Sequence, residues 1–268
     1  MTTHVEKLLL HKRALVACAL AALTLLAWIY IWRGAGMGMS ALEMTRLALF
    51  PHRADDAMTG MAMAMPFAWL SVVAMWWAMM IAMMVPGAAP LVLLYGMVRR
   101  KASPGTGLSY GSSLFVVVGY LLAWLAFSIA AATLQWLLVR GGVVSAMFLS
   151  SSSAALSAAV LLAAGLYQLS PLKRVCLVHC RGPVQFLSAH WRPGRIGALV
   201  MGFRHGMWCV GCCWLLMLLL FVGGVMNVAW IAALTLLVLV EKIAPGGAAA
   251  GKVAGALLLA WGVATLFA

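Results

Sequence analysis

Soft metal donors are concentrated in one stretch of the chain, between Cys176 and Cys213. This stretch contains five of the six cysteines and three of the six histidines. The donors form a C-x-x-H-C motif, a single histidine and an H-x-x-x-C-x-x-C-C motif, made by Cys176, His179, Cys180, His190, His205, Cys209, Cys212 and Cys213. Thiolate and imidazole donors suit a soft ion, with Cu(I) as the first candidate and Zn(II) as the second.

The second motif lies inside an apolar run that predicts a membrane helix over residues 196–221. At 3.6 residues per turn, His205, Cys209 and Cys212 lie on one face of that helix, with Cys213 at its edge. His205 and Cys212 are about 10 Å apart along the axis, so one ion cannot bind both on a straight helix. The alternatives are two sites on this helix, or one site completed by residues 176–190 folded back against it.

A purely structural interpretation of the cluster is the competing one. Cysteine packs as a small hydrophobic residue in membrane helices, and histidine can hydrogen-bond a neighbouring helix. The grouping of eight soft donors favours metal or thiol chemistry. A buried thiolate needs a cation, and Arg204 lies in the same run. Arg204 either offsets thiolate charge, pairs with Glu241 or bonds a backbone carbonyl, and the position of Glu241 indicates a charge at an interfacial helix end.

Methionines supply a second group of soft donors. A predicted outer loop has an M-x-x-M-x-M-x-M pattern, and exposed methionine has little reason to pack. The next helix carries a methionine stripe, for which core packing is the competing explanation. The residues are Met58, Met61, Met63 and Met65 in the loop, and Met75, Met79, Met80, Met83 and Met84 in the helix. Thioethers bind Cu(I) without deprotonation, so methionine outside and cysteine inside suits a copper-handling protein.

The composition is that of an integral membrane protein. Mean hydropathy is +1.07, and only 9% of the 268 residues are charged. The net charge of +13 is explained by Lys and Arg flanking membrane spans, and no nucleic-acid-binding motif accompanies it. The cysteines are not spaced as a secreted disulfide framework. We predict one all-α membrane domain over residues 1–268 and no nucleic-acid partner.

Seven membrane helices are predicted from the apolar runs. They cover residues 14–32, 66–85, 113–139, 154–169, 196–221, 225–240 and 253–267. Pro86 and Pro90 predict a break or kink after the second helix, before a short continuation to Val98. Residues 172–195 are expected to be basic and irregular, with one short helix at 184–191. A further short helix is expected at 42–50. The excess of Lys and Arg in alternate loops places the N-terminus in the cytoplasm and the C-terminus outside. This divides the chain into a first helix with its Met-rich loop (1–65), a core (66–247) and a last helix (248–268).

Several motifs within residues 66–247 occur in an order known from one bacterial family. They are W-W-A-M-M-I-A-M-M-V-P from Trp76, C-L-V-H-C-R-G-P from Cys176, H-W-R-P-G from His190, G-F-R-H-G-M-W-C-V-G-C-C-W from Gly202, G-G-V-M-N from Gly223 and E-K-x-x-P-x-G from Glu241. The chain resembles bacterial predicted metal-binding integral membrane proteins, which are linked to copper-chaperone function for tyrosinase-type copper enzymes. The resemblance implies copper delivery without catalysis, and it supports the importance of the Cys and His motifs.

Three functions are open at this point. The first is Cu(I) binding in a bacterial inner membrane, with delivery to a copper enzyme or metallochaperone client, or across or along the membrane. The second is a thiol–disulfide oxidoreductase that uses the Cys209/Cys212 pair, although no cysteine in a predicted outer loop could act as its partner. The third is a metal ion transporter. We favour the first.

Overall fold

The computed structural model describes residues 2–36, 40–49, 69–102, 109–141 and 154–267, and these residues form helices joined by short turns and bends. The predicted all-α class is confirmed. The helices are α1 (Thr2–Trp32), α2 (Ala41–Leu49), α3 (Trp69–Ala102), α4 (Ser109–Arg140), α5 (Ala154–Leu169), α6 (Pro171–Arg181), α7 (Pro183–His190), α8 (Gly194–Leu218), α9 (Leu220–Gly223), α10 (Val228–Ile243) and α11 (Gly247–Phe267).

Five helical segments are long and apolar enough to cross a membrane. They are Arg13–Trp32, Trp69–Arg100, Ser112–Arg140, Gly194–Gly223 and Gly247–Phe267. The pair α5 and α6, bent by 64°, makes a sixth if it is counted as one span. The remaining predicted span corresponds to α10, which has only 16 residues. The chain therefore has five to six candidate spans among its described residues, and the count of seven stays a prediction.

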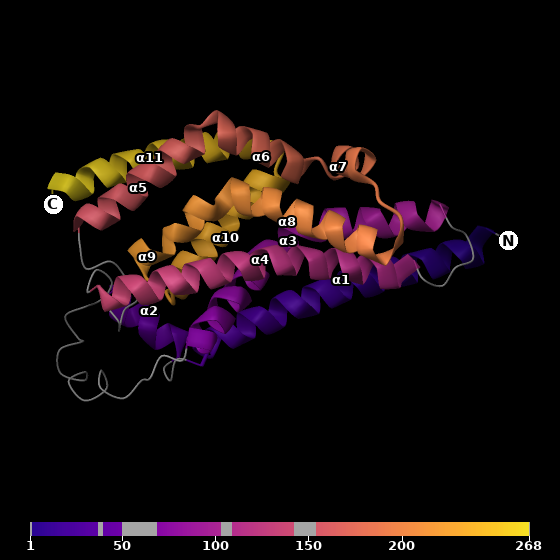
Figure 1. The fold of residues 1–268 in the computed structure, drawn as a ribbon, viewed down its shortest axis with the longest axis horizontal. Helices are drawn as coiled ribbons and strands as arrows, with labels where there is room; N and C mark the ends of the chain where they lie inside the picture. The colour runs from indigo at the N-terminus through magenta and orange to yellow at the C-terminus, as the bar shows by residue number, and fades with distance from the viewer. Residues whose placement is uncertain (1, 37–39, 50–68, 103–108, 142–153, 268) are drawn as a thin grey trace.

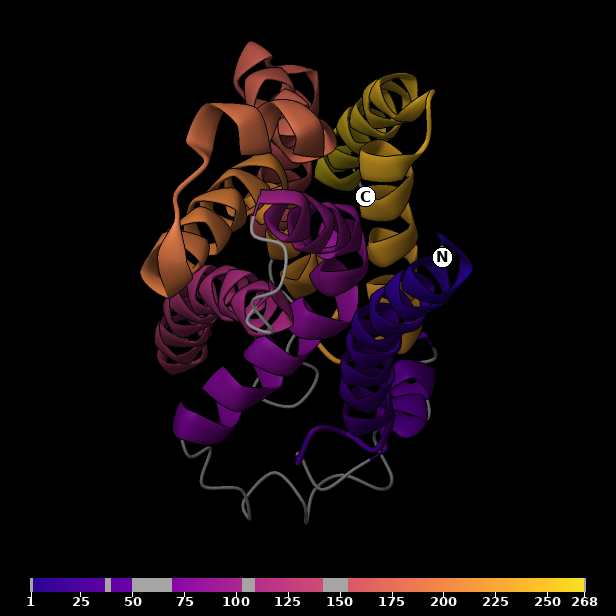
Figure 2. The same ribbon diagram turned by 90° about the vertical axis from the view of Figure 1, so that its right-hand side faces the viewer.

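The long helices run along the longest axis of the molecule, with the two chain ends at opposite ends of it (Figure 1). Helix α3 packs against α1, α4 and α10, and α4 packs against α8. Figure 2 looks along the long axis and shows α3 in the middle of this bundle, while α5 and α11 lie together on its outer side. Residues of α3 and α8 therefore meet in the interior.

Two predicted interruptions are absent. Helix α3 continues through Pro86 and Pro90, so the predicted break is absent. Membrane helices tolerate proline where the surroundings satisfy the backbone groups that it frees. The segment expected to be irregular begins with α6, where Ser170 caps the helix by accepting from the Lys173 amide at 3.2 Å. The first half of the Cys–His stretch is therefore helical.

Other local predictions agree with the structure. The short helices expected at 42–50 and 184–191 correspond to α2 and α7. The start of α2 is a capping box, in which the Ser40 amide donates to the Glu43 carboxylate (3.0 Å) and the Glu43 amide donates to the Ser40 hydroxyl (3.3 Å). The last helix is longer than predicted, because it begins at Gly247 rather than at residue 253.

Glycines allow α8 to approach α4 closely. A Cβ atom on Gly119 of α4 would lie 2.0 Å from the Leu199 carbonyl oxygen, and one on Gly202 of α8 would lie 2.0 Å from the Val116 carbonyl oxygen. Small residues at a crossing let helix backbones pack directly together in a membrane. This contact fixes the face of α8 that carries its cysteines toward the interior.

Replacing Gly202 by alanine will loosen this crossing. The added methyl group meets backbone atoms that cannot move aside, so we expect a loss of about 1–3 kcal/mol in stability. Thermal unfolding of the detergent-solubilised protein, followed by circular dichroism, measures it. Gly246→Ala is the matched control, because nothing lies within 4 Å of its added carbon. Equal melting temperatures for the two variants would contradict the proposed role of the glycine contact.

Candidate metal centre

Cysteines from α6 and α8 meet in the buried interior of the bundle. Cys209, Cys212 and Cys213 of α8 are at most 2% exposed, and Cys180 of α6 is 8% exposed. Helix α6 packs against α8, and the Cys180 side chain lies near those of Cys209 and Cys212. Cys213 Sγ lies 3.9 Å from Met84 Sδ of α3. These five residues, Cys180, Cys209, Cys212, Cys213 and Met84, are called the sulfur cluster below.

A lysine contacts the sulfur cluster from the end of α10. Lys242 Nζ lies 2.8 Å from Cys209 Sγ and 3.7 Å from Met84 Sδ, and the side chain is buried. Its alkyl chain passes Gly87 of α3, where a Cβ atom would lie 3.1 Å from Lys242 Cδ. Gly87 therefore leaves the space through which the lysine reaches the thiols.

The thiols are held by bonds to neighbouring groups. Cys212 and Cys213 both donate to the Cys209 carbonyl oxygen, at 3.2 and 2.8 Å. The Tyr120 hydroxyl lies 3.0 Å from Cys209 Sγ. Within the described residues, no three Cys, His, Asp or Glu side chains are arranged as a preformed metal site. On α8, the Cys212 and Cys213 thiols instead point to the backbone carbonyl that accepts their hydrogen bonds.

A buried ion pair lies next to the sulfur cluster. Lys173 Nζ of α6 contacts Glu241 Oε2 of α10 at 2.7 Å, and both side chains are at most 3% exposed. Gln168 of α5 donates to the other carboxylate oxygen of Glu241 at 2.6 Å. The pair therefore links α5, α6 and α10, and it helps to hold the Cys180-bearing helix against the rest of the bundle.

These contacts correct two expectations about charge. Glu241 lies near the end of α10, but it is buried within the protein and paired with Lys173 rather than exposed. The alternative in which Glu241 pairs with Arg204 is therefore wrong, and Arg204 lies exposed on α8. The sequence reasoning missed Lys242 as the cation at the thiols. The available signal was its place beside Glu241 in the E-K-x-x-P-x-G motif.

Two of the predicted histidines stack on aromatic rings. His179 of α6 is stacked on Trp208 of α8, with ring centroids 4.2 Å apart, and its Nδ1 lies 2.9 Å from the Val175 carbonyl oxygen. His190 at the end of α7 stacks on Phe186 at 4.8 Å. These contacts are those of packed imidazoles, and no contact joins either ring to the sulfur cluster in the described part of the chain.

His205 and Cys176 lie closer to the sulfur cluster. His205 is buried one turn from Cys209, its ring 5.1 Å from that of Phe186, and its Nδ1 has no hydrogen-bond partner. Cys176 Sγ would lie 3.2 Å from a Cβ atom on Gly211, which places it beside the Cys209–Cys212 turn of α8. His205 therefore has an unpaired ring nitrogen, and Cys176 has its thiol beside α8, close to the sulfur cluster.

The methionine stripe of α3 faces the interior. All five side chains, Met75, Met79, Met80, Met83 and Met84, are 0% exposed and belong to the hydrophobic core. Met84 belongs to the sulfur cluster through its contact with Cys213, whereas the other four lie among apolar neighbours. The loop methionines Met58, Met61, Met63 and Met65 lie outside the described residues.

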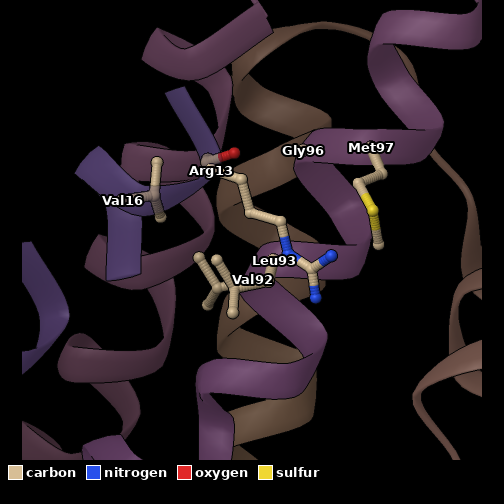
Figure 3. A pocket seen from close by; sticks show the side chains of 7 residues that line it. Arg13, Val16, Val92, Leu93, Gly96 and Met97 are labelled. Atoms are coloured by element: carbon tan, nitrogen blue, oxygen red, sulfur yellow. The ribbon is translucent and has the colours of Figure 1, made fainter. Parts of the chain in front are cut away.

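A pocket between α1, α3 and α4 is a separate feature. Figure 3 shows Arg13 of α1 extending over α3 toward Gly96 and Met97. The lining residues are Arg13, Val16, Val92, Leu93, Gly96, Met97 and Ser113. With one thioether and no cysteine or histidine, this pocket does not have the donors that a soft metal ion requires.

The fold and the sulfur cluster define a multi-pass helical membrane protein with buried thiols from two helices. Comparison with known proteins adds the particular family. The model of a family described as PpoB2, a copper chaperone, matches residues 73–265, which is more than two thirds of the chain. The chain belongs to this copper chaperone family. No curated protein and no solved structure matches it.

Proposed function

We propose that the protein binds Cu(I) at the sulfur cluster inside the membrane and delivers it to a copper-dependent enzyme or a metallochaperone client. The observation that carries this proposal is the meeting of Cys180 on α6 with the three cysteines of α8 and Met84 of α3. Thiolates and a thioether are the donors that favour Cu(I), with Zn(II) as the second candidate. Copper is the cargo, and the protein performs no catalysis on it.

Loading requires the thiols to exchange partners. Cys212 now donates to a backbone carbonyl, and as a thiolate it loses the proton that makes this bond. The metal then replaces the hydrogen bond, which accounts for a cluster whose side chains are close together but not preorganised. A site of this kind exchanges its ion more readily than a closed structural site, which suits delivery.

The remaining predicted donors are proposed to guide copper to or from the sulfur cluster. Cys176 and His205 lie beside it. His179 lies on α6, stacked on Trp208 of α8, and His190 is the last residue of α7. On the other side, the α3 methionines and the loop methionines Met58, Met61, Met63 and Met65 are proposed to carry copper from the outer face. The individual roles of these donors follow from their chemistry and order along the helices.

The proposed orientation is seven spans in a bacterial inner membrane, with α10 as a short seventh span, the N-terminus inside and the C-terminus outside. The Lys and Arg residues flanking α3 and α10 support this orientation. We expect alkaline phosphatase fused after Gly141 to be active and the same enzyme fused after Ala102 to be inactive. The reverse pattern would contradict the orientation and leave the sulfur cluster unaffected.

Copper analysis of the purified protein tests the function. After expression in copper-supplemented medium, we expect at least one Cu(I) per chain, and transfer of that copper to an apo copper enzyme on mixing. Protein that contains no copper under these conditions would contradict the proposal. Proteoliposomes distinguish transport from delivery, because a transporter moves copper into the lumen without a client protein.

A further inference from the structure

We propose that Lys242 makes the sulfur cluster selective for monovalent Cu(I) over divalent Zn(II). This inference rests on the proposed function, because it concerns the ion held at the same site. Its basis is the position of a buried ammonium group 2.8 Å from Cys209 Sγ and 3.7 Å from Met84 Sδ. An ammonium so close to the donors adds a fixed positive charge to any complex formed there.

The charge of Lys242 is available to the thiols because its neighbours are already balanced. Glu241, the next residue, is paired with Lys173 at 2.7 Å and also accepts from Gln168. Tyr120, which contacts the same thiol, is uncharged as a phenol. Lys242 therefore has the sulfur cluster as its anionic partner, and Gly87 provides the space that lets it reach there.

Charge neutrality decides between the two ions. In this proposal Cys209 and Cys212 bind the ion as thiolates, and the other cysteines of the sulfur cluster stay protonated. These two thiolates, one Cu(I) and the ammonium carry no net charge together, whereas the same set with Zn(II) carries one excess positive charge. Uncompensated charge is strongly unfavourable inside a membrane protein, where the surroundings screen it poorly. Without the ammonium the order reverses, since two thiolates and Zn(II) are then neutral and the Cu(I) complex is left with a negative charge. Lys242 is thus a specificity-determining neighbour of the ion.

The test is the ratio of Cu(I) to Zn(II) affinity in Lys242→Leu, measured in detergent by competition with chromophoric chelators. Leucine removes the charge without adding a sulfur donor. We expect Cu(I) affinity to fall at least tenfold and Zn(II) affinity to rise at least tenfold. Lys252→Leu is the matched control, because Lys252 is exposed on α11, and its ratio should equal that of the wild type. Lys242→Gln gives a second neutral side chain in case the leucine variant does not fold.

The outcomes separate this inference from the proposed function. If the wild type binds Cu(I) and the folded neutral variants keep its Cu(I)/Zn(II) ratio, the role of Lys242 is overturned and copper binding stands. If the wild type binds no Cu(I), the proposed function fails, and the proposed Cu(I) selectivity fails with it. A ratio that shifts toward Zn(II) in Lys242→Leu but not in Lys252→Leu supports the inference.

Discussion

Replacing Cys209 and Cys212 together by serine will abolish Cu(I) binding. Both side chains are buried in the sulfur cluster and both lie near Cys180, so the change removes two soft donors from one place. Serine hydroxyls are hard and do not ionise at neutral pH, and they cannot replace thiolates as Cu(I) ligands. The expected loss of affinity is more than about 100-fold, which exceeds the usual effect of changes outside the ligand shell. Competition with a Cu(I) chelator measures it.

Cys18→Ser is the control for this experiment. Cys18 is exposed on α1, away from the sulfur cluster, and its replacement should leave Cu(I) affinity unchanged. The double variant must also keep the helical circular dichroism of the wild type, so that loss of copper reflects loss of donors. Full Cu(I) binding by a folded double variant would show that the ion is held elsewhere, with the histidines or the methionines as the next donors to examine.

Replacing Glu241 by glutamine will destabilise the fold by about 3–5 kcal/mol, which is the usual effect of leaving one partner of a buried ion pair without the other. Lys173 would be left in a site where it is only 3% exposed, without the carboxylate that pairs with it. The link between α6 and α10 would weaken, and Cys180 would lose its fixed position near α8. Thermal unfolding in detergent measures the loss of stability.

The double variant Lys173→Met with Glu241→Gln is the informative comparison. Removing both charges takes away the unbalanced lysine, and such double replacements in other proteins are often neutral or stabilising. We therefore expect the double variant to melt well above the Glu241→Gln single variant. If the two melt together, the instability comes from the lost Gln168 contact or from packing rather than from the unpaired charge.

Local sequence patterns predicted much of the helical structure. Apolar runs gave α1, α4, α5 and α8, and the Ser40/Glu43 capping box gave the start of α2. Prolines were less informative, because a membrane helix can continue through proline, as α3 does at Pro86 and Pro90.

The sulfur cluster was predictable in part. The spacing of Cys209, Cys212 and Cys213 placed them near one face of a helix, and one of the two stated alternatives brought the Cys176–His190 segment back against it. Contact between Cys180 and α8 requires the bend at Ser170 and the Lys173–Glu241 pair, which local spacing does not reveal. Lys242 was missed because a lysine at a helix end normally marks the membrane interface.

X-ray absorption at the copper edge of the purified, copper-loaded protein tests the central claim most directly. The account predicts Cu(I) surrounded mainly by sulfur, and loss of that sulfur shell in the Cys209→Ser/Cys212→Ser variant but not in Cys18→Ser. A copper ion surrounded by nitrogen or oxygen in the wild type, or a sulfur shell that survives in the double variant, would contradict it.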